Sequence, residues 1–237
     1  MKNYKALLFD LDNTLLDFSA SESIALTSLY TNHFTCKTGH SFNKFRNEYH
    51  AINKRFWQQV EAEEIKPNDV NLLRFIKLLK RYNLSTDVKQ IADSYENEMA
   101  HAASWYEGVE HAVIQLQKNY KLGILTNGVT HVQKIKFKNA SLHGLFETLI
   151  ISGEVKLAKP NKKIFDIALN DLGHEAKDVL MIGDSLQSDF QGAINAGLDF
   201  CWVSNKKGNF SRFKKSPEYI VQSVKELPEL LETTVLA

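Results

Sequence analysis

The chain has 237 residues and a mass of 27.0 kDa, the size of one large domain or two small ones. Its 29 basic and 28 acidic residues give a net charge of +1, so charge gives no reason to expect a nucleic-acid polymer or an anionic membrane as partner. No stretch approaches the roughly 18 apolar residues of a membrane span. The two cysteines, Cys36 and Cys201, match no metal or redox spacing. We expect a globular protein of a reducing, cytoplasmic compartment.

The first apolar run predicts a buried strand over residues 5–10, followed closely by two carboxylates, Asp10 and Asp12. Side chains alternate along an extended segment, so these two should project the same way. Two carboxylates held this close repel each other, and one would keep its proton unless a cation lay between them. Open α/β sheets bind ligands at the carboxyl ends of their strands. The pair therefore indicates a site that uses a cation.

Four helical patterns follow this strand with no strand between them, over roughly residues 19–103. Ser19 and Glu22 have the spacing of a capping box for the first helix. An uninterrupted run of helices after one strand indicates a helical bundle inserted into a sheet domain. We expect a cap over residues 18–103 and a core domain formed by 1–17 and 104–237.

From Gly108 onward, helical and strand patterns alternate. Strands are expected at 122–126, 149–152, 179–182 and 200–203, with a short edge strand at 219–221. This alternation predicts an α/β fold with a doubly wound, mostly parallel sheet.

The second strand ends in Thr126-Asn127-Gly128. A hydroxyl and backbone N–H groups at a helix start would suit an anion. Asn-Gly is also a strong hairpin signal, whereas Val129, Val132 and Lys136 fit a helix at this point.

Two later strands are also followed by charged residues. The loop after the third strand carries Lys156 and Lys159, and the fourth strand ends at Gly183-Asp184, with Asp189 expected to open the next helix. Taken singly, each lysine suits a solvated loop and each aspartate suits a helix cap. Taken together, these groups would meet in one crevice: carboxylates at two strand ends, a hydroxyl at another strand end, and a lysine beyond the third strand. Such hard oxygen ligands suit Mg²⁺.

Rival phosphate-binding motifs are absent from the sequence. It contains no G-x-x-x-x-G-K-[ST] segment, and no G-x-G-x-x-G follows a predicted strand.

The four polar segments resemble the motifs of the haloacid dehalogenase-like (HAD) superfamily, in that family's order and across nearly the whole chain. The segments are Asp10-x-Asp12-x-Thr14, Thr126-Asn127, Lys159-Pro160 and Gly183-Asp184-x4-Asp189. The resemblance implies a Rossmann-like core with an α-helical cap of the four-helix-bundle type, inserted after the first motif.

The resemblance also implies a role for each residue. Asp10 is the nucleophile that forms an aspartyl-phosphate, and Asp12 is the general acid and then the general base. Lys159, rather than Lys156, offsets negative charge on the nucleophile and the phosphate. The second motif, Thr126-Asn127, holds the phosphoryl oxygens.

The implied cofactor is Mg²⁺, held by Asp10, Asp184 and the backbone carbonyl of Asp12, with Asp189 behind them. A bound Mg²⁺ would resolve the repulsion between the first two carboxylates. Dehalogenases of the superfamily lack a carboxylate at the position of Asp12, so dehalogenation is disfavoured.

Longer segments resemble bacterial pyrimidine 5′-nucleotidases of this superfamily. They run from Leu8 to Phe18, from Leu125 to Gly128 and from Ala158 to Phe165. The resemblance implies a small phosphomonoester substrate, namely UMP, dUMP or dTMP. The alternatives are another small-metabolite phosphatase or a sugar phosphomutase. A non-catalytic phosphate-binding protein would be expected to have lost one of the two motif aspartates, and both are present.

Substrate specificity is expected to come mainly from the cap. Phe18, Phe56 and Trp57 are candidates to stack on a base, and Arg55 could reach a polar edge. Packing within the helical bundle is the competing explanation for these side chains. Nothing in the sequence indicates an oligomeric state.

Overall fold

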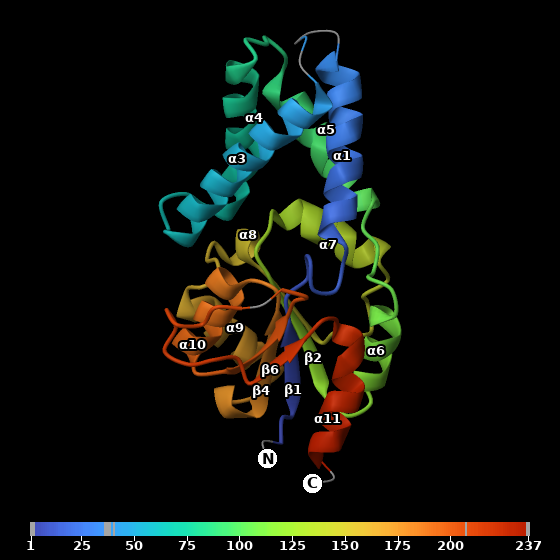
Figure 1. Cartoon of the computed structure of the whole chain (residues 1–237), viewed down its shortest axis with the longest axis vertical. Coiled ribbons are helices and arrows are strands. Elements are labelled where there is room, and N and C mark those ends of the chain that lie inside the picture. Colours follow the sequence, from blue (N-terminus) through green and yellow to red (C-terminus); the bar gives the residue numbers. More distant parts are fainter. Residues whose placement is uncertain (1–2, 36–38, 40, 207, 236–237) are drawn as a thin grey trace.

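The computed structural model describes residues 3–35, 39, 41–206 and 208–235. Figure 1 shows an elongated molecule, with the sheet and both chain ends in its lower part and a group of helices in its upper part. Cys36 lies outside the described residues, and Cys201 is buried with a free thiol.

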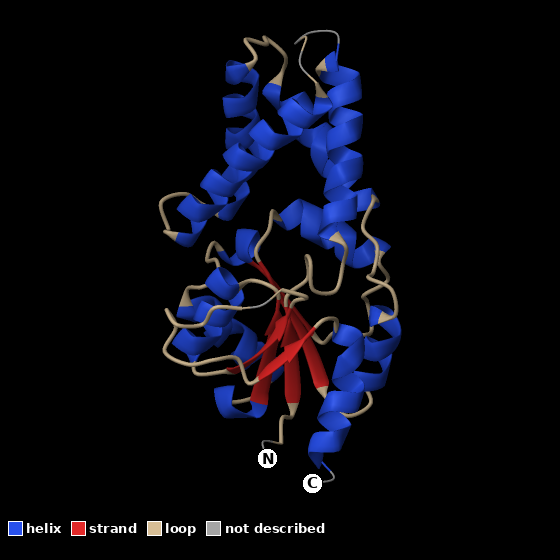
Figure 2. Cartoon of the chain, viewed as in Figure 1, coloured by secondary structure: helices blue, strands red, loops and turns tan. Residues whose placement is uncertain are grey.

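A six-stranded parallel sheet forms the lower part, in the order β3-β2-β1-β4-β5-β6 (Figure 2). The strands are β1 (Ala6–Phe9), β2 (Lys121–Thr126), β3 (Thr148–Ile151), β4 (Val179–Gly183), β5 (Asp199–Val203) and β6 (Tyr219–Val221). The central strand β1 is buried on both faces: Leu7 and Phe9 pack in one apolar cluster, Ala6 and Leu8 in the other. This two-sided burial explains why the first strand reads as an unbroken apolar run.

Helices cover both faces of the sheet. One face packs against α6 (Val109–Leu116) and α11 (Leu227–Val235). The other packs against α9 (Lys162–Leu172) and α10 (Gln191–Ala196). The prediction of a doubly wound parallel α/β sheet is confirmed.

Four long helices lie beyond the carboxyl edge of the sheet (Figure 1). They are α1 (Phe18–His33), α3 (Phe42–Glu61), α4 (Val70–Arg81) and α5 (Val88–His101). Their apolar sides meet in a third cluster that includes Phe45, Tyr49, Phe75 and Tyr95. The predicted helical cap is therefore present as an insert between β1 and β2. The exact boundaries at 17/18 and 103/104 stay predictions.

The chain leaves and re-enters the sheet domain through two adjacent segments. The backbone N–H of Asp17 donates to the Ser104 carbonyl over 2.9 Å, and the N–H of Tyr106 donates to the Leu15 carbonyl over 3.1 Å. These bonds hold the two linkers of the cap side by side. Leu16 and Trp105 form an isolated antiparallel β-bridge between them.

The cap also touches the sheet domain through α7 (Thr130–Asn139) and through a 3-10 turn, η1 (Pro67–Asp69). Helix α5 packs on α7. In the turn, Asn68 donates to the Gly153 carbonyl over 3.0 Å and accepts from the Thr130 N–H over 3.1 Å. Gly153 belongs to the short helix α8 (Ser152–Val155), directly after β3.

Two sequence-based expectations about helix starts are wrong. Helix α1 begins after Asp17, whose Oδ1 accepts from the Ala20 N–H over 2.9 Å, so Ser19 lies inside the first turn and no capping box forms. Asp189 does not open a helix, because it lies within the π-helical turn Leu186–Phe190 that precedes α10. In both places an earlier oxygen-bearing residue takes the cap, and for the π-turn that residue is Ser185. Among the described residues, no helix is long and apolar enough to cross a membrane.

Candidate active site

The register of the central strands sets the expected site residues side by side. Phe9 pairs with Ile124 on one side and with Ile182 on the other. The next residue, Asp10, donates its backbone N–H to the Ile182 carbonyl over 2.8 Å and so extends the ladder. Since all these strands are parallel, the residues that follow them emerge at the same edge of the sheet.

Lys159 lies at the centre of this edge, and its side chain is 1 % exposed. Its Nζ lies 2.5 Å from Asp10 Oδ1 and donates to the Leu125 carbonyl over 2.8 Å. The same Nζ lies 2.7 Å from Asp189 Oδ1, so one ammonium forms ion pairs with both aspartates. Lys156, the other lysine considered from the sequence, is exposed.

Asn127 holds the loop that carries this lysine. Its Nδ2 donates to the Lys159 carbonyl, and its Oδ1 accepts from the Lys159 backbone N–H, each over 2.9 Å. Both ends of the Asn127 amide are therefore used within the protein. A phosphate at this position would meet the backbone of Asn127 rather than its side chain.

Three carboxylates form a compact acidic cluster next to Lys159. Asp10, Asp184 and Asp189 each place a carboxylate oxygen within 4.8 Å of the others. Burial raises the pKa of Asp10 to about 7, against the attraction of Lys159. Burial raises the pKa of Asp184 to about 8, and the charges of Asp10 and Asp189 add to that effect. One ammonium does not balance three carboxylates, of which Asp10 and Asp189 are buried and Asp184 is partly exposed, and hard oxygen donors at this spacing fit a divalent cation such as Mg²⁺.

The position of Asp189 depends on Gly183. Asp189 is 1 % exposed, and its Oδ2 accepts from the Ser185 N–H over 3.0 Å. A Cβ at residue 183 would lie only 2.3 Å from that Oδ2. The glycine at the end of β4 thus makes room for the third carboxylate of the cluster.

Asp12 has different neighbours from Asp10. Its Oδ1 lies 2.6 Å from Lys136 Nζ, and its Oδ2 accepts from Gln133 Nε2 over 2.8 Å. Gln133 Nε2 also donates to Thr126 Oγ1 over 3.0 Å. Both partners come from α7 and both are 2 % exposed. The acidic cluster contains the side chain of Asp10 but not that of Asp12.

Gln133 and Lys136 were not among the site residues expected from the sequence. Their spacing of three residues on a helix does place them on one face. That spacing, in the helix directly after Thr126, is the signal that could have drawn attention to them.

A cavity of about 250 Å³ lies between Asp12 and the cap. Phe18 and Trp57 line it, as proposed from the sequence for contact with a base. Arg55 and Phe56 do not, because they line a different cavity of about 470 Å³ between α3 and α4. Two of the four side chains considered for substrate contact therefore lie where a leaving group could reach them.

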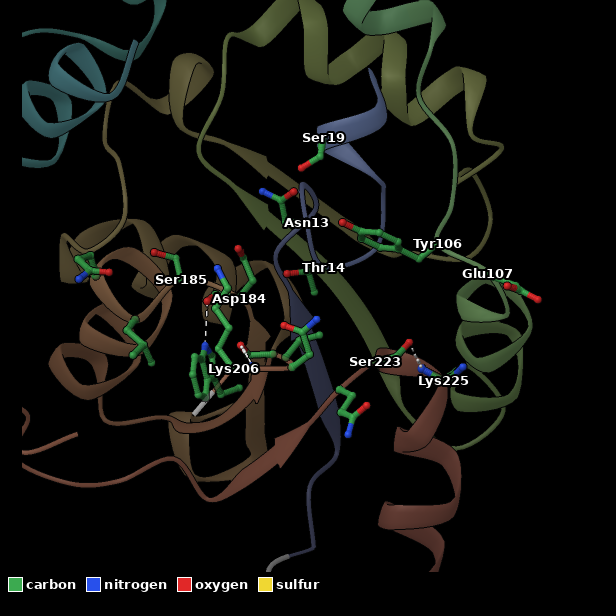
Figure 3. A pocket seen from close by; sticks show the side chains of 17 residues that line it. Asn13, Thr14, Ser19, Tyr106, Glu107, Asp184, Ser185, Lys206, Ser223 and Lys225 are labelled. Atoms are coloured by element: carbon green, nitrogen blue, oxygen red, sulfur yellow. Dashed lines mark hydrogen bonds between the residues drawn. The ribbon is translucent and has the colours of Figure 1, made fainter. Parts of the chain in front are cut away.

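A larger cavity, of about 920 Å³, is lined by Asp184 of the acidic cluster. Figure 3 shows Thr14, Asp184 and Lys206 around this cavity, with Ser223 and Lys225 on another part of its wall. Of the acidic cluster, Asp184 lines this cavity, and Ser19 of the cap helix α1 lines it as well.

Comparison with known proteins gives consistent matches over nearly the whole chain. Residues 7–203 match the family model of the haloacid dehalogenase-like hydrolases. The chain is 32 % identical to the HAD-hydrolase YfnB of Bacillus subtilis, covering 99 % of both chains. A crystal structure of YfnB bound to magnesium superimposes with a TM-score of 0.84 at 30 % identity, covering 98 % of this chain and 100 % of the other.

Two pyrimidine 5′-nucleotidases are similar to the same degree. PynA of Streptococcus pneumoniae is 31 % identical, covering 98 % of this chain and 97 % of PynA. YjjG of Escherichia coli is 32 % identical, covering 95 % of this chain and 96 % of YjjG. The matching family, the shared fold and the motif residues gathered at one sheet edge agree: this chain is an enzyme of the haloacid dehalogenase-like hydrolase family.

Proposed function

We propose that this protein is a Mg²⁺-dependent phosphomonoesterase that hydrolyses pyrimidine nucleoside 5′-monophosphates. One observation carries the proposal: Asp10 and Asp12, two residues apart, have separate surroundings suited to separate tasks. Asp10 lies against Lys159 in the acidic cluster, and Asp12 lies against α7 beside the cavity under the cap.

In the first step, an Asp10 carboxylate oxygen attacks phosphorus and the bond from phosphorus to the nucleoside 5′-oxygen breaks. Asp12 gives a proton to that oxygen, so the nucleoside leaves neutral. In the second step, Asp12 takes a proton from water, and the resulting hydroxide attacks phosphorus. Phosphate leaves, and the Asp10 carboxylate is restored.

Lys159, Thr126 and the backbone of Asn127 would hold the phosphoryl oxygens during both steps. Lys159 also supplies the positive charge closest to the nucleophile, at 2.5 Å. Gln133 links Thr126 to Asp12, because its one amide nitrogen donates to both side chains.

Asp10, Asp184 and the backbone carbonyl of Asp12 are proposed to hold the Mg²⁺, with Asp189 behind them. When bound, the ion offsets the charge of the phosphoryl group and of the carboxylates around it. The compact cluster and the raised pKa values of Asp10 and Asp184 support this assignment.

The substrate class is supported by the likeness to PynA and YjjG and by the small cavity above Asp12. A cytoplasmic location, expected from the sequence, belongs to the same proposal. The deciding experiment is a phosphate-release screen over nucleoside monophosphates and sugar phosphates, with Mg²⁺ and with EDTA.

We expect pyrimidine monophosphates to give the highest kcat/KM, and EDTA to abolish turnover. Equal rates for sugar phosphates and pyrimidine nucleotides would reject the substrate class. Conversion of a sugar phosphate to its isomer without phosphate release would identify a phosphomutase instead.

A further inference from the structure

The cavity between Asp12 and the cap has a polar wall that the catalytic residues do not account for. Asn53 from α3 and Arg74 from α4 line it on the cap side. Asp12, Gln133 and Lys136 line it on the side of the sheet domain. A leaving group attached to a phosphate at Asp10 would extend past Asp12 towards the two cap residues.

Arg74 is a buried cation with few strong partners. It is 5 % exposed, and its Nε is buried without a hydrogen-bond partner. Its Nη atoms donate only over long distances, 3.3 Å to Asn53 Oδ1 and 3.4 Å to Asn71 Oδ1. Within the described part of the chain, no carboxylate oxygen lies within 4.0 Å of this guanidinium, and the charges of Glu96 and Glu22 stabilise it only from a greater distance.

Aromatic rings hold the guanidinium in place. Its Cζ lies 4.5 Å from the ring centroid of Tyr95, 5.1 Å from that of Phe75 and 6.0 Å from that of Tyr49. These contacts fix the orientation of Arg74 but use none of its N–H donors. Each Nη atom carries two N–H groups and uses one of them, for Asn53 or Asn71, so the other N–H of each remains for a ligand.

The orientation of the Asn53 amide follows from Arg74. A guanidinium can only donate, so the amide oxygen of Asn53 must face it, at 3.3 Å. The Asn53 NH₂ group is then the part left to interact with a ligand. The cap wall of the cavity thus offers hydrogen-bond donors from both residues.

The other cap residues of the cavity favour a flat ligand. Phe18 and Trp57 contribute rings, and Tyr95 and Met99 contribute further apolar surface. The volume of about 250 Å³ is below the range of about 300–1,000 Å³ typical of larger ligands. The aromatic walls and the small volume of the cavity fit one planar ring better than a branched polyol.

We propose that Asn53 and Arg74 recognise the leaving group by donating hydrogen bonds to carbonyl oxygens on the edge of a pyrimidine ring. This inference rests on the proposed nucleotidase function and assigns its specificity to two residues. Uracil and thymine carry two ring carbonyls, whereas cytosine has an amino group in place of one. An amino group facing these donors leaves both sides without a partner.

The test compares UMP, CMP and ribose 5-phosphate, which lacks a base, as substrates of the wild-type protein and of Asn53→Leu and Arg74→Lys. The wild-type protein should prefer UMP to CMP by about 10- to 100-fold in kcat/KM, since unmatched polar groups reject an analogue strongly. Asn53→Leu should bring that ratio close to one by slowing UMP, with ribose 5-phosphate changed less than about threefold.

Arg55→Leu is the matched control for Asn53→Leu. Arg55 lies on α3, as Asn53 does, but it lines the cavity between α3 and α4. It should keep the wild-type ratio of UMP to CMP. Arg74→Lys retains the charge but loses the planar fork, so it should also lower the ratio. If Arg74→Lys fails to fold, the ratio of UMP to CMP in the wild-type protein and in Asn53→Leu still tests whether these residues recognise the base.

An unchanged ratio of UMP to CMP in folded Asn53→Leu would overturn the inference while leaving the nucleotidase function intact. A wild-type protein that turns over ribose 5-phosphate as well as UMP would overturn both. A sugar-acid phosphate preferred over UMP, with that preference lost in Arg74→Lys, would show that the guanidinium binds a carboxylate and would also overturn it.

Discussion

Lys136 Nζ lies 2.6 Å from Asp12 Oδ1, and the lysine side chain is 2 % exposed. The pair joins α7 to the loop after β1, across 124 residues of sequence. A buried ammonium at this distance orients the carboxylate that the proposed mechanism uses for proton transfer.

We predict that Lys136→Met lowers kcat/KM for a nucleoside monophosphate by about 10- to 100-fold, a part of the roughly 10²–10⁴-fold that general acid–base catalysis contributes. The loss should be smaller with p-nitrophenyl phosphate, whose leaving group departs without a proton. Steady-state kinetics with both substrates measure this difference.

Lys134→Met is the control for that substitution. Lys134 lies on the same helix, is 54 % exposed and pairs with Glu154, and exposed pairs contribute little. An equal loss on both substrates in Lys136→Met would count against a role in orienting Asp12.

The two aspartates should fail in different ways. Asp10→Asn should abolish turnover and leave no acid-stable phosphate on the protein, because the attacking oxygen is lost. Asp12→Asn should keep a residual rate of about 10⁻²–10⁻⁴ of the wild type. It should also accumulate phosphorylated protein with p-nitrophenyl phosphate, detectable as intact mass after rapid quenching. Phosphate found on Asp10→Asn would place the nucleophile elsewhere.

Gly183→Ala should disturb the acidic cluster without altering any charge. Its new Cβ would lie 2.3 Å from Asp189 Oδ2, in a buried site that cannot easily yield. We expect a loss of about 1–3 kcal/mol in unfolding free energy, and each kcal/mol lowers the Tm of a chain this long by roughly 2–4 °C. Thermal unfolding measures it.

Gly123→Ala, also in a central strand, provides the comparison. There the nearest atoms are leucine methyl groups at 3.2 Å, at the ends of side chains that can shift. Combining Gly183→Ala with Asp189→Ala should restore part of the lost stability but not the activity. A fully additive double variant would show that the clash with Asp189 is not the cause.

The acidic cluster should make the stability of the metal-free protein depend on pH. The folded-state pKa values of Asp10 and Asp184, about 7 and about 8, lie above the ordinary aspartate value. A raised folded pKa means that the folded state binds protons more tightly than the unfolded chain, so stability falls as pH rises through that value.

In EDTA, we therefore expect the Tm to fall between about pH 6 and pH 8.5. Added Mg²⁺ competes with protons for the same oxygens, so the rise in Tm on adding Mg²⁺ should be larger at pH 8.5 than at pH 6. Asp184→Asn should weaken both trends. A Tm in EDTA that rises over this range would contradict the charge assignment.

The parts of the site that the sequence predicted are those fixed by the sheet. Asp10 and Asp184 follow β1 and β4, and Thr126 ends β2, the other neighbour of β1; parallel register brings such residues together without knowledge of any loop. The alternation of strands and helices therefore predicted both the fold and the edge where these side chains meet.

The residues that the sequence did not predict depend on how helices pack. Gln133 and Lys136 reach Asp12 because α7 crosses the end of β1, and Asn53 meets Arg74 because α3 packs on α4. Periodicity gives the apolar face of a helix but not its partner. The start of α1 was missed for a local reason: Asp17 suits a cap as well as Ser19 does.

Helix α7 belongs to two structures at once. Val132 is buried in the apolar cluster of the cap, whereas Gln133 and Lys136, on the same helix, hold Asp12. If the cap moved outward, Val132 would become exposed to water, or α7 would move with the cap and its contacts with Asp12 would break. We therefore expect any outward movement of the cap to disturb the contacts that Gln133 and Lys136 make with Asp12.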